Sequence, residues 1–157
     1  MIRIQVTAIY PSPIQTVFDE HRNVDLHVKS QASHRERAIG GVTSGLLNLG
    51  DEVEWEAVHF GVKQRLRAKI TQMSAPDSFS DEQLSGPFKS LVHQHRFKSL
   101  DSGATEKTEI VELRAPLGPL GVIAERVFLG RYMQKLLEDK SRAMGGEVVD
   151  ATVTYKD

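Results

Sequence analysis

Four polar side chains fall on strand faces that are otherwise apolar: His59, His93, His95 and Glu109. In a strand, successive side chains point to opposite faces, and the neighbours two positions away from these four are mostly apolar. Imidazole and carboxyl groups in an apolar cavity can exchange protons near neutral pH, because burial shifts their pKa values. The same groups could instead orient a hydroxyl or carbonyl group of a bound molecule.

A short turn decides whether these groups meet. Residues 101–103 read Asp-Ser-Gly, which favours a turn. A three-residue turn centred on Ser102 would place His95 opposite Glu109, with both side chains pointing inward. Three interpretations stay open: a hydrogen-bonded structural cluster, a set that orients a ligand, or catalytic acid–base groups. The catalytic candidates are His95, Glu109, His93 and His59.

A zinc site is the sharper alternative, since His93 and His95 lie two positions apart and His59 and Glu109 add further ligand types. Strand alternation alone produces such a histidine pair, however, and His59 lies on a strand that could be two places away. The chain has no cysteine, which excludes thiolate metal sites and cysteine nucleophiles. We therefore expect no metal and no cofactor.

The elements that would position these residues follow from hydrophobic patterning. Residues 2–10 alternate as a half-buried strand, and Ser12 with Pro13 would start a first short helix. A short edge strand is expected after Pro76, and residues 34–46 show only weak patterning. The expected order is a strand (2–10), two short helices (14–21, 24–30), strands (51–60, 62–74, 88–100, 105–114), a long helix (120–144) and an extra strand or tail within 145–157.

Two independent patterns predict one hairpin. A tight turn at Phe60-Gly61 pairs residue 55 with 66 and residue 53 with 68. That register puts the apolar side chains of both strands on one side. It also sets a row of glutamates (52, 54, 56) opposite a row of basic residues (65, 67, 69) on the other side.

The long helix carries two apolar stripes on nearly opposite sides, and Gly130 lies where one gives way to the other. The first stripe contains Leu120, Ile123, Ala124, Val127 and Phe128. The second contains Leu129, Tyr132, Met133, Leu136 and Leu137. Either one half packs on the sheet and the other covers a cavity, or loops or a partner subunit bury both.

Composition limits the class of protein. The 157 residues suit a single domain, 1–157, and 39% hydrophobic with 26% charged residues are typical of globular proteins. A net charge of −1 argues against nucleic acid as the partner. The N-terminus does not resemble a signal peptide, and no stretch of about 20 apolar residues could span a membrane. We expect a cytoplasmic protein.

Several motifs resemble the START/polyketide-cyclase (SRPBCC) superfamily, in particular its bacterial ligand-binding subgroup with cyclase/dehydrase-like or cell-division-inhibitor-like members. They are PIQTVF (13–18), VEWEAVHFG (53–61), DEQLSGPF (81–88), HQHRF (93–97), APLGPLG (115–121) and RYMQKLL (131–137). The resemblance implies an α+β helix-grip fold, in which a seven-stranded antiparallel sheet wraps around a long C-terminal helix. It also implies a cavity between sheet and helix.

The predicted function is binding of a hydrophobic or amphipathic small molecule, such as a lipid or polyketide, in that cavity. The alternatives are a cyclase/dehydrase-type enzyme that uses the His/Glu groups, or a regulatory interaction module; a homodimer is left open. The predicted ligand-binding residues are Trp55, His59, Leu66, His93, His95, Phe97, Glu109, Val111, Leu113, Ile123 and Val127.

Overall fold

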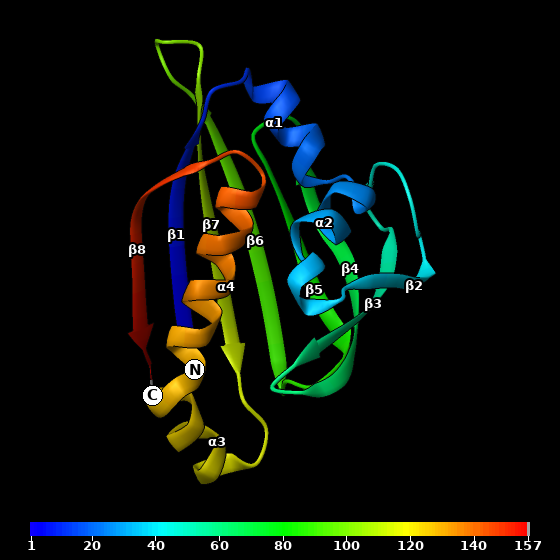
Figure 1. Ribbon diagram of the computed structural model, residues 1–157, viewed down its shortest axis with the longest axis vertical. Helices are drawn as coiled ribbons and strands as arrows, with labels where there is room; N and C mark the ends of the chain where they lie inside the picture. Colours follow the sequence, from blue (N-terminus) through cyan, green and yellow to red (C-terminus); the bar gives the residue numbers. More distant parts are fainter. Residues whose placement is uncertain (157) are drawn as a thin grey trace.

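The structure is a computed structural model that describes residues 1–156. Across those residues the chain forms one antiparallel sheet of eight strands in the order β2-β3-β4-β5-β6-β7-β1-β8 (Figure 1). The strands are β1 (Ile2–Tyr10), β2 (Arg37–Gly41), β3 (Glu52–His59), β4 (Val62–Ser74), β5 (Ser78–Ser85), β6 (Ser90–Ser99), β7 (Thr105–Arg114) and β8 (Glu147–Tyr155).

The helical segments lie over one face of this sheet. They are α1 (Ile14–His21), α2 (Val24–Ser30), η1 (Ala32–His34), α3 (Gly118–Ala124), the π-helical η2 (Glu125–Leu129) and α4 (Gly130–Ala143). Figure 1 shows α4 crossing the sheet over its β1 and β8 side, while α3 extends past the ends of the strands. Among residues 1–156, no helix is both long and apolar enough to cross a membrane.

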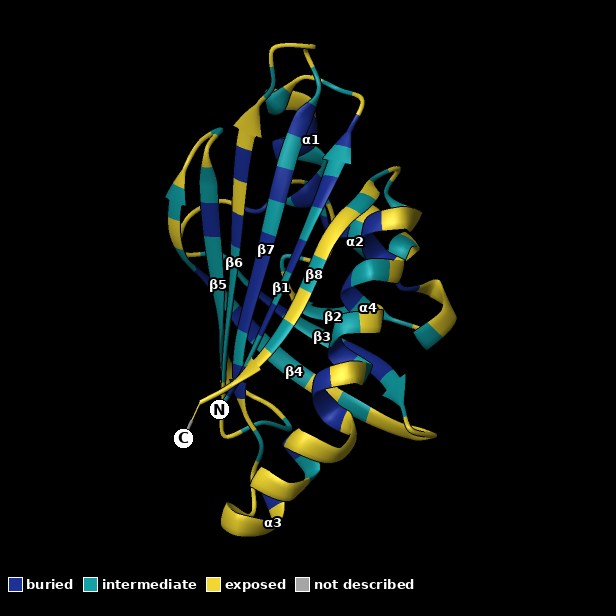
Figure 2. Cartoon of the chain, turned by 90° about the vertical axis from the view of Figure 1, so that its left-hand side faces the viewer, coloured by how far each residue is buried: buried dark blue, intermediate teal, exposed yellow. Residues whose placement is uncertain are grey.

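Two apolar clusters form the core between the helices and the sheet. The first lies beneath α1 and α2 and includes Phe18, Phe79 and Phe97, whose rings meet edge to face or stacked. The second lies beneath α4 and joins Ile4, Val111 and Leu113 of the sheet to Met133 and Leu137 of the helix. In Figure 2 buried and intermediate residues alternate along the interior strands β1 and β7, whereas β8 at the sheet edge is mostly exposed.

Gly130 allows α4 to approach the sheet closely. A Cβ atom built at this position would lie 2.6 Å from Tyr155 Oη and 3.0 Å from Val153 Cγ1, both on β8. Any larger residue would require the side chains of Tyr155 and Val153, or the helix itself, to shift, since such distances are shorter than normal van der Waals contact. The glycine between the two predicted stripes is therefore a contact point with the sheet.

The predicted hairpin is confirmed in register. Trp55 pairs with Leu66 and Val53 pairs with Ala68. The turn residues Phe60 and Gly61 have φ values of 53° and 71°, as a two-residue hairpin turn requires. The predicted pairing of His95 with Glu109 across β6 and β7 is also confirmed.

Other expectations were wrong in detail. The sheet described by residues 1–156 has eight strands rather than seven, although the extra C-terminal strand expected within 145–157 is present as β8, paired with β1. β5 is an interior strand between β4 and β6, not an edge strand. The weakly patterned segment forms the true edge strand β2, whose Gly40 and Gly41 hide any alternation. Ser12 does not cap α1, since Pro13 occupies the cap position and makes no side-chain bond.

Candidate functional site

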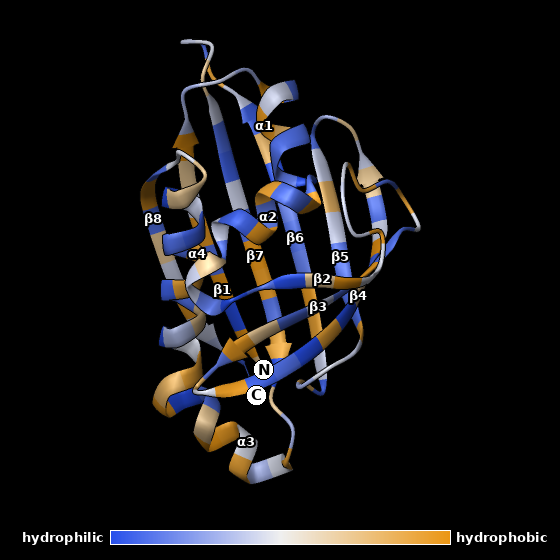
Figure 3. Cartoon of the chain, turned by 45° about the vertical axis from the view of Figure 1, so that its right-hand side comes forward, coloured by the Kyte–Doolittle hydropathy of each residue, from blue (hydrophilic) through white to orange (hydrophobic). Residues whose placement is uncertain are grey.

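A pocket of about 330 Å³ lies between the concave face of the sheet and α4. Its sheet wall carries Trp55 and Leu66 from the hairpin and Val111 from β7, and Met133 and Leu137 of α4 close the opposite side. Along β3, β4 and β7 successive side chains point to opposite faces of the sheet, and those that point towards the helix here are apolar. Figure 3 shows a stretch of hydrophobic residues along β7, next to α4 in this view.

The carboxylate of Glu109, only 2% exposed, lies behind the polar end of this pocket, where Asp81, His93 and Lys140 line it. Its Oε1 atom accepts hydrogen bonds from Nζ of Lys107 at 2.6 Å and from Nζ of Lys140 at 3.4 Å. The imidazoles of His93 and His95 also lie 3.5 Å from the same oxygen. Within residues 1–156, Oε2 of Glu109 has no hydrogen-bond partner.

The register of the strands explains why these groups gather. On the inner face of β7, Lys107 and Glu109 lie between residues of the two apolar clusters. On β6, His95 lies opposite Glu109, and His93 lies opposite Val111, the next position on the same face. Lys140 reaches the same level from α4, one turn beyond Leu137. The polar groups thus form a band between the two apolar clusters, and each must find its hydrogen-bond partners within that band.

Asp81 of β5 completes this cluster on the side away from Glu109. Its Oδ2 atom lies 3.2 Å from Nε2 of His95 and 3.9 Å from Nδ1 of His93. Asp81, His93 and Lys140 line the pocket, whereas His95 lines a smaller adjoining space of about 60 Å³. Of the two histidines, His93 is therefore the one that a pocket ligand would meet.

Protonation in the cluster follows from burial and neighbouring charge. Burial alone would raise the pKa of Glu109, but the ammonium groups of Lys107 and Lys140 hold it well below its ordinary value, so Glu109 is ionised. Burial, with the charges of His93 and Lys107, lowers the pKa of His95 to about 4. Burial also lowers the pKa of Lys107 to about 7, against the attraction of Glu109.

A second polar group lines the opposite part of the pocket. His59 Nδ1 lies 2.5 Å from the hydroxyl group of Tyr132 on α4, so the helix and the hairpin are joined across the pocket. The pKa of His59 is lowered, chiefly by burial and also by His34. Trp55 stacks on His27 with ring centroids 4.3 Å apart. The pocket thus has an apolar middle and polar groups at both ends.

Known proteins resemble this chain in structure rather than in sequence. No protein-family model matches the chain, and no curated protein matches it by sequence. The START superfamily protein from Mycobacterium smegmatis superposes with a TM-score of 0.71 at 9% identity, over 92% of this chain and 95% of that chain. The chain has the helix-grip fold of the START superfamily.

Two further structures show the same helix-grip fold. The protein TTHA0849 from Thermus thermophilus superposes with a TM-score of 0.75 at 12% identity, over 91% of this chain and 94% of that chain. The major latex-like protein 151 of Panax ginseng gives a TM-score of 0.65 at 15% identity, over 91% and 94%. At these identities the comparison concerns the fold alone.

The helix-grip arrangement brings together only part of the predicted set. Trp55, His59, Leu66, His93 and Val111 line the pocket. Glu109 and His95 are buried at and behind its polar end. Phe97 and Leu113 belong to the two apolar clusters and do not line the pocket. The assignment of these nine residues to ligand binding stays a prediction, and so do the cytoplasmic location and the homodimer.

Ile123 and Val127 lie outside the pocket, which corrects their predicted place. They are 58% and 69% exposed, because α3 extends past the strand ends and Val127 of η2 faces away from the core, towards which Leu129 of the same segment points. The second stripe, on α4, covers the pocket instead, through residues such as Met133 and Leu137. α3 is consequently strongly hydrophobic in Figure 3 yet exposed in Figure 2.

Three polar residues of the site were missed from the sequence. Lys107 shares the inner face of β7 with Glu109, so simple alternation could have found it. Lys140 continues the Met133–Leu137 stripe at helical spacing, which also could have been noticed. Asp81 could not be placed, because its strand was expected at an edge of the sheet rather than beside the histidines.

Proposed function

We propose that the chain acts as a single domain that binds a hydrophobic or amphipathic small molecule between the sheet and α4. The observation that carries the proposal is the pocket of about 330 Å³ with apolar walls and a few polar groups at its ends. This volume lies at the small end of the range of about 300–1,000 Å³ that is usual for small-molecule sites. A compact molecule with one or two oxygen functions suits this space better than a long acyl chain.

The two ends of the pocket would recognise different parts of the ligand. His93 and Lys140 offer donors at the deep end, beside the carboxylates of Asp81 and Glu109. The Tyr132–His59 pair offers a hydroxyl group and an imidazole at the other end. An apolar ring or chain between them would contact Trp55 and Met133. Binding would remove apolar surface of the ligand and the pocket from water, which is favourable by about 25 cal/mol per Å² buried.

The single tryptophan provides the test, since Trp55 lines the pocket. Titration with the amphipathic dye anilinonaphthalenesulfonate should give saturable energy transfer from Trp55 to the dye. Ala57→Phe, which fills the space beside Trp55, should weaken dye binding at least tenfold. Val149→Phe, on the exposed face of β8, is the matched control and should bind like the wild type.

Thermal unfolding of each variant shows whether it retains the fold. If the dye shows no saturable binding, or if Ala57→Phe binds it as tightly as Val149→Phe does, the pocket is not the binding site. Native mass spectrometry of the purified wild-type chain adds an independent readout, because a small molecule that copurifies would appear as a defined mass increase.

A second candidate function is acid–base catalysis of the cyclase/dehydrase type. The favouring observation is that His93 faces the pocket while Glu109, held in its ionised form, lies 3.5 Å from its Nε2 atom. A histidine oriented by a carboxylate can remove a proton next to a carbonyl group. His95 is buried outside the main pocket, so its role would be to position neighbouring groups.

We expect a catalytic His93 to accelerate exchange of the α-hydrogen of a β-keto thioester for deuterium, followed by NMR. His93→Gln should slow this exchange at least tenfold, while Arg96→Gln, on the opposite face of the same strand, should leave it unchanged. Exchange no faster than in buffer alone, or equal rates in both variants, would leave binding as the only function.

A further inference from the structure

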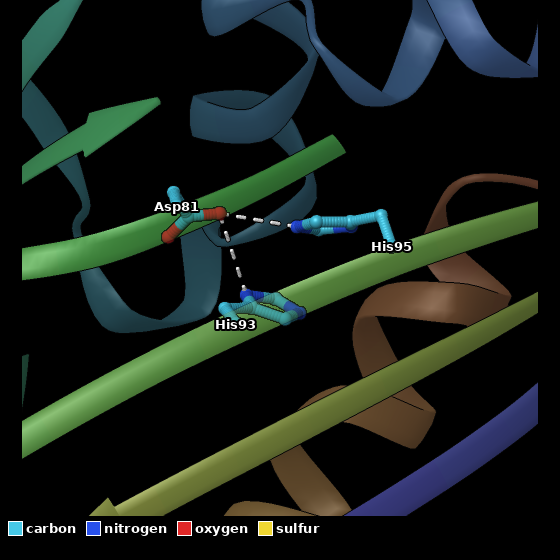
Figure 4. A group of neighbouring side chains, drawn as sticks. All are labelled: Asp81, His93 and His95. Atoms are coloured by element: carbon cyan, nitrogen blue, oxygen red, sulfur yellow. Dashed lines mark hydrogen bonds and ion pairs between the residues drawn. The ribbon is translucent and has the colours of Figure 1, made fainter. Parts of the chain in front are cut away.

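Asp81, His93 and His95 present three ligand atoms to one point, as Figure 4 shows. Oδ2 of Asp81 and one nitrogen of each imidazole all lie within 4.8 Å of one another. The distances from Oδ2 are 3.2 Å to His95 Nε2 and 3.9 Å to His93 Nδ1. Donor atoms around a tetrahedral zinc ion lie about 3.3 Å apart, given bonds of about 2.0–2.1 Å. The three atoms therefore need only small shifts to surround an ion.

Glu109 lies on the far side of both rings. Its Oε1 atom is 3.5 Å from His93 Nε2 and 3.5 Å from His95 Nδ1, the two nitrogens that point away from Asp81. Metal-binding histidines commonly donate their other ring N–H group to a carboxylate, which fixes the tautomer and turns the free lone pair towards the metal. Here one carboxylate is placed to do this for both rings.

Without a cation this arrangement leaves polar groups unmatched. Each neutral imidazole has one N–H group, yet each ring lies between two carboxylates. Among residues 1–156, His93 Nε2 and His95 Nδ1 are buried and make no hydrogen bond. If both rings donate their N–H group to Glu109 rather than to Asp81, the lone pairs of His93 Nδ1 and His95 Nε2 face the carboxylate of Asp81. A cation at that point would be bound by all three groups.

We propose that Asp81, His93 and His95 bind a divalent transition-metal ion such as Zn²⁺ at the deep end of the pocket. Two imidazoles and one carboxylate are ligands that suit zinc and non-haem iron. Asp81 and His93 line the pocket, so the remaining coordination position faces it. This site differs from the zinc site considered from the sequence, since Asp81 replaces His59 and Glu109 orients the rings.

The charges of the cluster determine what completes the coordination. Lys107 and Lys140 both contact Oε1 of Glu109, so the two ammonium groups are balanced by Glu109 and Asp81. A divalent ion adds two positive charges that these groups do not balance. An anionic oxygen, either hydroxide or a carboxylate of the pocket ligand, would balance part of this charge as the fourth ligand. The metal proposal stands even if no apolar molecule binds.

The test is isothermal titration of the untagged, chelator-stripped chain with ZnCl₂ in a buffer that does not bind zinc. We expect one ion per chain. Asp81→Asn keeps the size of the side chain but removes its charge, and it should weaken binding at least tenfold. Glu109→Gln should weaken binding about 10-fold, in line with other outer-sphere partners. Asp150→Asn, on the exposed edge strand, is the matched control and should bind like the wild type.

A second measurement needs no variant. Co²⁺ bound to the wild-type chain should give the strong visible absorption of a tetrahedral site and should broaden the NMR signals of His93 and His95 before those of the other histidines. Absence of stoichiometric binding, equal affinity in Asp81→Asn and Asp150→Asn, or broadening that begins at His34 or His59 would each overturn the proposal.

Discussion

Replacing Glu109 with leucine should lower the free energy of unfolding by about 3–5 kcal/mol at neutral pH. Glu109 is buried and is the anion that both Lys107 and Lys140 contact. Its removal leaves the amine of Lys107, itself 2% exposed, without its partner, so Lys107 must either hold an unpaired buried charge or give up its proton, and both cost more than the lost contacts alone. Lys140, 4% exposed, also loses this partner, although it lines the pocket.

A double-mutant cycle isolates this effect. Lys107→Met combined with Glu109→Leu removes both members of the pair and should recover stability to within about 1 kcal/mol of the wild type. Glu112→Leu is the control on the same strand. Its carboxylate lies on the opposite face, 3.4 Å from partly exposed Arg3, and such pairs contribute about 0–1 kcal/mol. Urea unfolding measures the wild type, the single variants Lys107→Met and Glu109→Leu, the double variant and the control, and losses that simply add in the double variant would show that the pair is not coupled.

The sequence predicted those parts of this site where two sequence patterns, such as turn residues and strand alternation, require the same strand register. The register of β3 and β4 followed because an apolar row and a charged row both required it. The pairing of His95 with Glu109 followed because a short turn leaves a single register. In both cases local turn chemistry and strand alternation act together, so little tertiary information is needed.

The helix and β5 depended on tertiary information that the sequence does not display. Both stripes of the long helix are apolar, so hydrophobicity could not tell Ile123, which lies beyond the sheet, from Met133, which covers the pocket. That difference arises from where the sheet ends. Asp81 was missed for a similar reason, since its strand is short, follows Pro76 and shows no alternation that distinguishes an interior strand from an edge strand.

Buried His21 should make the fold sensitive to acid in a way that one substitution reverses. Its Nδ1 atom lies 2.7 Å from the carbonyl oxygen of Val17, to which it donates, and its ring contacts Tyr10 and Phe97. Among the described residues, Nε2 has no hydrogen-bond partner. Burial, and then the positive charges of Lys107 and Lys140, lower the pKa of His21 well below its ordinary value, although Glu109 opposes this.

The unfolded chain therefore binds a proton at His21 as the pH falls below about 6.5, whereas the native chain does not. Native stability falls by up to about 1.4 kcal/mol per pH unit in that range, which amounts to about 2 kcal/mol at pH 5. His21→Phe removes this titration and keeps an aromatic ring among Tyr10 and Phe97. The free energy of unfolding of this variant should lie within about 1 kcal/mol of the wild-type value at pH 7 and exceed the wild-type value at pH 5. Urea unfolding at both pH values in the presence of a chelator measures the change, and an unchanged difference between the two proteins would mean that His21 titrates normally in the native fold.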